Sequence, residues 1–205
     1  MARPPRYDES DLLDAALRLA AAHGPAAVTM SAVARECGAP SGSVYHRFPQ
    51  RAVLLAELWL RTVDEFQAGY LAALDSHPQP HEAGGAAARH VVAWSRTHPE
   101  QAAVLLHGPD AFHQAEWPEP YARRLADDNR RVRERLSALA VQLGATAAAD
   151  VERVVLAAVD LPLALVRRHL RGRTPLPEFA EDLAQDGAID LLRGLAVSAG
   201  ARTRP

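Results

Sequence analysis

The sequence predicts an all-α protein with a short N-terminal helix-turn-helix and a longer C-terminal helical region. Alanine, a strong helix former, accounts for 42 of the 205 residues, whereas aromatic residues make up only 5%. Apolar residues recur at helical spacing, and no stretch alternates with a period of two. Glycine and proline punctuate the chain at intervals that suit helices.

The composition is that of a globular protein, with 48% apolar and 23% charged residues. The first ten residues contain no apolar signal core, and no uncharged apolar run reaches the ~20 residues of a membrane span. We therefore expect a cytoplasmic location. The single cysteine, Cys37, excludes an internal disulfide and a cysteine-based zinc site, and we interpret it as a small packed residue.

The net charge of −2 argues against a simple polybasic nucleic-acid binder. All 23 basic residues are arginines, which we attribute to codon bias. The charge is unevenly distributed, however: residues 1–51 carry +1 and residues 52–205 carry −3. Basic groups thus gather in the N-terminal segment, where the helix-turn-helix is expected.

Four helices are predicted in the N-terminal part, at about 8–23, 31–37, 41–48 and 50–74. The first has acidic residues in its first turns, which the helix dipole favours. Thr29 or Ser31 is suited to cap the second. The second and third helices are too short to be stable alone and must pack on the others. Together they describe a helix-turn-helix.

The C-terminal part begins with a predicted linker at 75–85, which contains two prolines and two glycines. Further helices are expected at about 86–98, 100–108, 118–144, 148–172 and 177–199. We place the domain boundary after residue 51, so that 1–51 form one domain and 52–205 the other. The helix at about 50–74 connects them.

The stretch from Thr29 to Arg51 carries the most functional information. Val44 and Phe48, four residues apart, are expected to anchor the inner side of the third helix. Its outer side then exposes hydroxyls, a glycine and hydrogen-bonding rings, at Ser41, Gly42, Ser43, Tyr45, His46 and Arg47. Such a surface suits phosphate contacts and base readout in a DNA major groove. The alternative is an incidental helical hairpin with a polar face.

Residues 10–62 resemble the N-terminal domain of TetR/AcrR transcriptional regulators. The similar segments are LLDAALRLAAAHG, the T-x-x-x-V-A-x-x-x-G core from Thr29 to Gly38, and SGSVYHRFPQRAVLL from Ser41 to Leu55. The resemblance implies that Thr29 and Ser31 contact phosphate and that Ser41, Gly42, Ser43, Tyr45 and His46 face the groove. It implies a phosphate contact for Arg51, where the family commonly has lysine.

Two residues depart from the family pattern. Ser41 stands where lysine or arginine is often found, and Arg47 stands where an aromatic residue is common. We expect Arg47 to restore the charged contact that Ser41 lacks. On the N-terminal arm, Arg3 and Arg6 either reach an adjacent groove or belong to a solvated terminus.

The C-terminal half resembles the family's variable domain, which usually binds a small effector and dimerises. The helices at 148–172 and 177–199 are both rich in apolar residues, and two from each subunit would form a four-helix interface. Core packing within one chain is the alternative for the same residues.

Candidates for an effector pocket are the aromatic residues of this half and one acid. They are Trp59, Phe66, Tyr70, Trp94, Phe112, Trp117, Tyr121 and Asp160. Asp160 interrupts an apolar run, so it is expected either to receive a cationic or hydroxyl-bearing effector or to pair with Arg153 or Arg167. The arginine-rich stretch 123–135 is interleaved with Asp127, Asp128 and Glu134, which indicates a solvated, salt-bridged face.

No metal site and no cofactor are expected, because the histidines lack the spacing of a helical metal-binding pair. No enzyme motif is present either. We expect a homodimeric repressor that binds a pseudo-palindromic DNA operator and is released by a small molecule. The alternative is a helical DNA-binding regulator that is controlled by a protein partner.

Overall fold

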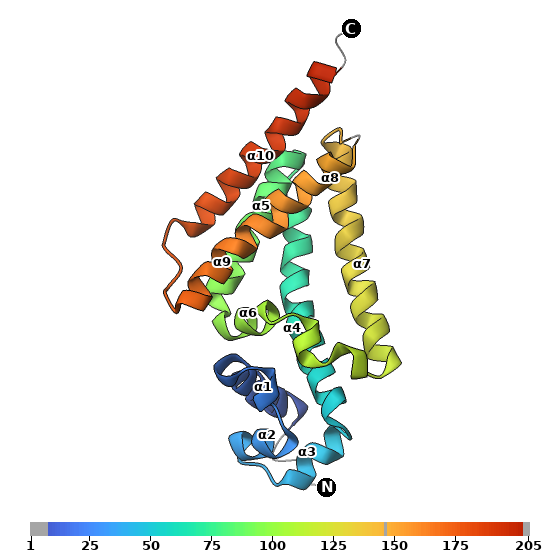
Figure 1. Cartoon of the computed structure of the whole chain (residues 1–205), viewed down its shortest axis with the longest axis vertical. Helices are drawn as coiled ribbons and strands as arrows, with labels where there is room; N and C mark the ends of the chain where they lie inside the picture. The colour runs from blue at the N-terminus through green and yellow to red at the C-terminus, as the bar shows by residue number, and fades with distance from the viewer. Residues whose placement is uncertain (1–7, 146, 203–205) are drawn as a thin grey trace. The chain divides into compact units, whose positions relative to one another are not determined.

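The computed structural model describes residues 8–145 and 147–202, with side chains up to Leu195. Every regular element in this part is helical, as predicted (Figure 1). Arg3 and Arg6 lie outside the described residues. The helices pack into two units, one of residues up to Asp64 with Pro99–Ala126, and one of Glu65–His98 with the residues from Asp127 on. None of the described helices is long and apolar enough to cross a lipid bilayer.

The first unit begins with α1 (Glu9–His23), whose N-terminus is closed by a reciprocal capping box. Asp8 Oδ1 accepts from the Asp11 amide, and Asp11 Oδ2 accepts from the Asp8 amide, both at 2.9 Å. A 3₁₀ turn, η1 (Pro25–Ala27), leads to α2 (Met30–Cys37) and α3 (Ser41–Arg47). The expected boundaries of these helices are thus confirmed to within one or two residues.

The same unit contains the start of α4 (Arg51–Leu74), together with α6 (Pro99–Leu106), the 3₁₀ helices η2 (Pro109–Phe112) and η3 (Gln114–Glu116), and the start of α7 (Glu119–Gln142). Its core is one cluster in which α1, α2, α3 and α4 bury their apolar faces. Val44 and Phe48 are fully buried there, which confirms their role as inner anchors of α3.

The second unit contains the remainder of α4 and α7, with α5 (Pro80–Thr97), α8 (Ala148–Val155), α9 (Leu161–Gly172) and α10 (Ala180–Arg202). Helix α5 packs most extensively against α10 and also against α9 (Figure 1). Ile189 and Leu192 of α10 lie against Gly85 and Gly84 of α5, and both side chains are buried. This confirms that apolar residues of this helix pack in the core of one chain, which was one of the two interpretations offered for them.

The predicted linker at 75–85 is wrong in its second half. Helix α5 begins at Pro80, which suits the first turn of a helix because its missing N–H needs no partner there. Gly84 and Gly85 are helical and buried against α10, where a Cβ on Gly84 would lie 2.3 Å from Leu192 Cδ1. These glycines are explained by close helix packing, and not by a flexible connection.

The predicted helix at 148–172 is interrupted by a π-helical turn at Leu156–Asp160. Pro162 explains this turn, because it has no N–H for the carbonyl of Ala158, four residues earlier. The Tyr70 hydroxyl donates to that carbonyl instead, at 3.2 Å. A residue of α4 thus donates to a carbonyl that the proline itself cannot serve.

The substitution Gly85→Ala tests the close packing of α5 on α10. Its new Cβ would lie 2.6 Å from Ile189 Cγ1 and 3.3 Å from the Gln185 carbonyl oxygen. We expect the free energy of unfolding to fall by about 1–3 kcal/mol in a urea titration. Gly42→Ala in α3 is the control, because nothing lies within 4 Å of its added Cβ and the titration contains no DNA. Equal stability of the two variants, at one low protein concentration, would contradict the packing argument.

Candidate functional site

The turn between α2 and α3 is fixed by backbone geometry and one cap. Thr29 is the N-cap of α2, and its Oγ1 accepts from the Ala32 amide at 3.1 Å. Ser31 Oγ lies 3.3 Å from the same oxygen, so both hydroxyls lie together on an exposed edge. Gly38 ends α2 with a φ of 69°, in the left-handed region that favours glycine. The chain then turns directly into α3.

Helix α3 divides into a buried and an exposed side. Val44 and Phe48 are buried in the core of the first unit. Ser41, Gly42, Tyr45 and His46 are exposed, while Ser43 and Arg47 are half-buried. Tyr45 is 56% exposed, so its ring and hydroxyl are open to solvent. The structure therefore brings the predicted groove-facing residues together on one short helix.

Arg51 does not simply extend into solvent. Its Nε donates to the Val28 carbonyl at 2.7 Å, and its Nη2 donates to the Pro25 carbonyl at 3.0 Å. The side chain is half-buried and joins the first residue of α4 to the segment before α2. Its Nη1 makes neither of these bonds, so a phosphate contact from that atom stays a prediction. Sequence reasoning identified the charge of Arg51 but missed this structural role.

The aromatic pocket candidates separate into the two units. In the first, Trp59 packs on Phe112 with ring centroids 5.1 Å apart, and Trp117 Nε1 donates to the Phe112 carbonyl at 2.8 Å. These three rings are buried, and Tyr121 is half-buried beside them. They serve as core in this structure, and Trp59 Nε1 is buried without a hydrogen-bond partner in it.

The second unit holds a separate aromatic cluster between α4 and α5. Phe66 lies 5.7 Å from Tyr70 and meets Trp94 edge-on at 5.2 Å, measured between ring centroids. His90 completes the cluster, with Nε2 at 3.1 Å from the Phe66 carbonyl and its ring 5.4 Å from that of Phe66. Burial lowers the pKa of His90, which favours the neutral ring with Nε2 as the donor. Burial, together with the charge of Asp160, raises the pKa of Tyr70.

Asp160 was selected as a carboxylate buried within an apolar run, and this is wrong for the chain as described. Its side chain lies on the exposed side of the π-helical turn, whereas Ala157 and Ala158 of that turn are buried, and it forms no salt bridge with Arg153 or Arg167 in the described part of the chain. Asp128 is the buried acid instead, with only 3% of its surface exposed. The described residues contain no group of three or more His, Cys, Asp or Glu side chains arranged to hold a metal ion.

Comparison with known proteins identifies the N-terminal part of the chain. Residues 12–58 match the family model of bacterial regulatory proteins of the tetR family, and this span runs from α1 into α4. Residues 12–58 therefore form a DNA-binding domain of the TetR family. A search of curated protein sequences gave no match.

Solved structures share the fold of this TetR-family chain over nearly its whole length. A transcriptional regulator from Rhodococcus sp. RHA1 is 21% identical, with a TM-score of 0.69 over 92% of this chain and 97% of that one. The regulator FadR from Bacillus subtilis, solved with stearoyl-CoA, is 14% identical, with a TM-score of 0.67 over 90% and 97%. The ketosteroid regulator KstR2 of Mycobacterium tuberculosis is 20% identical, with a TM-score of 0.67 over 94% and 97%.

The family assignment gives the coarse function. The chain is a DNA-binding transcriptional regulator. Because the family consists of regulators and not of enzymes, the expectation that this chain is not an enzyme is confirmed. The exposed side of α3 described above belongs to the matched segment.

Arg51→Ala is expected to lower the free energy of unfolding by about 1–3 kcal/mol, because two carbonyl oxygens lose a charged donor. Arg51→Lys should fall between wild type and Ala, since an ammonium cannot reproduce the fork of the guanidinium. Urea titrations without DNA measure both, with the exposed Arg35→Ala as control. If Arg51→Ala and Arg35→Ala are equally stable, Arg51 has no structural role.

Proposed function

We propose that this TetR-family chain is a repressor that binds a pseudo-palindromic operator as a homodimer and is released by a small-molecule effector. The observation that carries the proposal is the exposed side of α3, presented by a helix whose other side is fully buried. A short helix fixed in this way can enter a major groove without losing its shape. The two-fold symmetry of a dimer then implies two half-sites about one helical turn apart, or a multiple of it.

The contacts with DNA divide by chemistry. The hydroxyls of Thr29 and Ser31, at the start of α2, suit phosphate oxygens. Tyr45 and His46 project from α3 and suit base edges as well as phosphate. Ser41, Gly42 and Ser43 leave room for close approach of the DNA backbone, and Arg47 and Arg51 supply positive charge. For Arg3 and Arg6 we keep the proposal of a contact in an adjacent groove.

Substitution of the α3 residues tests this assignment. A binding site is first selected from random DNA with the purified full chain. Tyr45→Ala or His46→Ala should then lower affinity for the selected site by about tenfold to a hundredfold, because each loses contacts made only to that site. His77→Ala, an exposed histidine in the loop before α5, should bind as wild type. Unchanged affinity of both α3 variants would refute the assignment.

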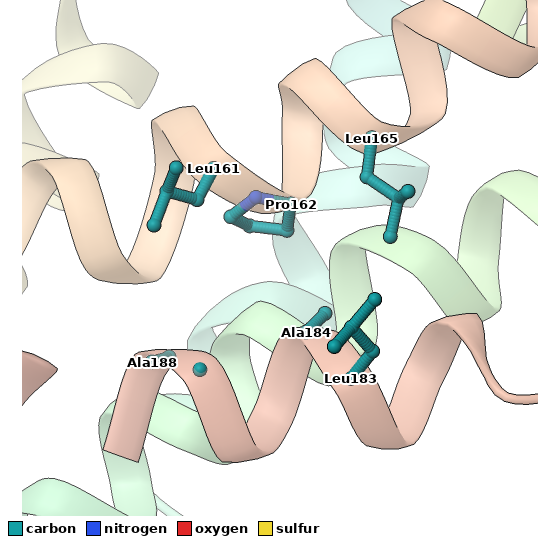
Figure 2. A pocket seen from close by; sticks show the side chains of 7 residues that line it. Leu161, Pro162, Leu165, Leu183, Ala184 and Ala188 are labelled. Atoms are coloured by element: carbon teal, nitrogen blue, oxygen red, sulfur yellow. The ribbon is translucent and has the colours of Figure 1, made fainter. Parts of the chain in front are cut away.

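The dimer is proposed to form through α8, α9 and α10. Large apolar residues are exposed along these helices and just before α10, at Val151, Leu156, Leu161, Phe179 and Leu183. An open apolar groove lies between α9 and α10, lined by Leu161, Pro162, Leu165, Leu183, Ala184, Gly187 and Ala188 (Figure 2). Its small residues on α10 allow another helix to approach closely. A second copy of the chain, with the same exposed helices, is the occupant that this surface fits.

Leu183→Glu tests the dimer surface, because it would place a charge in the centre of the contact. We expect the dimer dissociation constant to rise by about a hundredfold or more, measured by sedimentation equilibrium. Val141→Glu is the matched control, since Val141 is 74% exposed on α7 and lies outside this surface. A monomeric wild-type chain, or equal dissociation constants for the two variants, would contradict the proposal.

Support for a small-molecule effector comes from the structural relatives and from the second unit. One relative was solved with stearoyl-CoA, and another is named a ketosteroid regulator. In this chain the candidate region is the aromatic cluster between α4 and α5, since α4 also begins at the DNA-binding module. An effector must bind the released form more tightly than the DNA-bound form, because equal affinity shifts nothing. Control by a protein partner is the alternative: release of the operator from the purified chain by a small molecule alone would exclude it.

A further inference from the structure

The outer side of α8 and α9 carries charges that the apolar groove does not explain. On the inner side of these helices, buried residues recur every four positions, at Val154, Ala158, Pro162 and Val166. The opposite side is exposed at the same spacing, at Glu152, Leu156, Asp160, Ala164 and Arg168. The π-helical turn joins the two helices, so this exposed row is continuous. We call the exposed residues from Glu152 to Arg171 the outer strip.

The charges on the outer strip are sorted by sign along the helices. Its first half carries two exposed acids, Glu152 and Asp160. Its second half carries three exposed arginines, Arg167, Arg168 and Arg171. Within the described part of the chain, none of these five residues forms a salt bridge. Each half of the strip therefore presents charge of one sign that no opposite charge of the same chain neutralises.

Residues of the same helix cannot supply the opposite charges. Ion pairs along a helix need a spacing of three or four residues, and on both sides of Glu152 and Asp160 those positions are apolar. Arg167 lies seven residues beyond Asp160, a rise of about 10 Å, which exceeds this spacing. Arg167 and Arg171 are four residues apart, where like charges repel each other. Arg153, the basic residue of the first half, is half-buried and lies against α10.

A second copy of the chain carries the complementary pattern in reverse. When two identical helices pack antiparallel about a two-fold axis, the first half of each lies beside the second half of the other. The groove lies near the middle of the strip, since Leu161 and Leu165 line it from α9 (Figure 2). With the axis midway between these leucines, position 160 faces position 166 of the partner, and position 152 faces position 174. Asp160 then comes within one turn of the partner's Arg167, and the acid at 152 within one turn of the partner's Arg171.

We propose that the arginines of the outer strip form intersubunit salt bridges with Glu152 and Asp160, and that these pairs set an antiparallel register and select a second copy of this chain. The inference rests on the dimer of the proposed function. Two-fold symmetry makes each pair occur twice, and the partner's acids relieve the repulsion between Arg167 and Arg171. Nucleic acid would match the arginine half but would be repelled by the acidic half.

Two variants of the full chain test the pairing by reversing one half of the strip each. The acid-reversed chain carries Glu152→Arg and Asp160→Arg, and the arginine-reversed chain carries Arg167→Glu and Arg171→Glu. When either variant pairs with itself, like charges face each other, so its dimer dissociation constant should rise by about a hundredfold. In a 1:1 mixture opposite charges face each other again, and the heterodimer should bind within about fivefold of the wild-type dimer. Sedimentation equilibrium of each chain and of the mixture measures these constants.

Matched controls apply the same reversals to the exposed face of α7. One control carries Asp127→Arg and Glu134→Arg, and the other carries Arg130→Glu and Arg133→Glu. Their net charges equal those of the two strip variants. Each control should dimerise as wild type, and their mixture should show no gain in affinity, because these residues lie outside the proposed surface.

A neutral variant keeps the test decisive if a reversed chain fails to fold. Glu152→Gln with Asp160→Asn removes both acids, adds no charge and keeps the side-chain shapes. Its dimer dissociation constant should rise by about tenfold, because each lost pair occurs twice. A wild-type constant for this variant would overturn the pairing.

The remaining outcomes separate the register from the dimer itself. A mixture that associates no better than the reversed chains alone would overturn the pairing. So would an arginine-reversed chain that dimerises as wild type but no longer binds random-sequence DNA, since its arginines would then serve nucleic acid. If Leu183→Glu separates the subunits while the reversals do not, the proposed dimer stands and only the register fails. A monomeric wild-type chain would refute both.

Discussion

The burial of one side of α2 and α3 is the constraint on which the rest of this structure depends. These helices have eight and seven residues, which is too short for stability in water. They persist because Val33, Val44 and Phe48 are almost completely buried in a core shared with α1 and α4. With the inner side fixed, the exposed side of α3 is the surface that we propose contacts DNA. Substitutions in this core are therefore expected to weaken DNA binding by displacing α3, although the substituted residues do not themselves contact DNA.

Arg51 extends the same constraint to α4. Its guanidinium joins the first residue of that helix to two carbonyls in the segment that leads into α2. A displacement of the start of α4 would therefore break two hydrogen bonds or move the segment with it. Helix α4 continues into the second unit, where Phe66 and Tyr70 belong to the aromatic cluster. One helix therefore carries both the hydrogen bonds of Arg51 and the residues proposed to contact an effector. In the function proposed above, α4 is the helix that connects the effector contacts with the DNA-binding module.

The N-terminal helices were predictable because their signals are local. Caps, apolar spacing and the Gly38 turn all lie within a few residues of the boundaries that they determine. Gly84 and Gly85 were misinterpreted because their reason is not local: they are small so that Leu192 and Ile189, more than a hundred residues later, can approach α5. A segment with glycines a few residues after prolines looks the same in sequence whether it forms a flexible linker or a closely packed helix. Only the partner helix distinguishes them.

The two acids show a similar limit. Asp160 was selected because its sequence neighbours are apolar, yet it lies on the exposed side of the π-helical turn, opposite the buried Ala157 and Ala158. Asp128 was assigned to solvent because its neighbours are charged. Helical periodicity from Leu125 through Asp128 to Leu136 would have indicated its burial, since these positions share one face. Periodicity along a helix is therefore a better guide to a buried charge than the composition of the segment.

The buried acceptors of the second unit suggest why Asp128 is exceptional. Where Pro162 removes a donor, the freed carbonyl of Ala158 receives the Tyr70 hydroxyl, and the Phe66 carbonyl gains His90. Neutral acceptors are thus satisfied by the chain itself, while the charged oxygen of Asp128, which is the most costly to bury, is not.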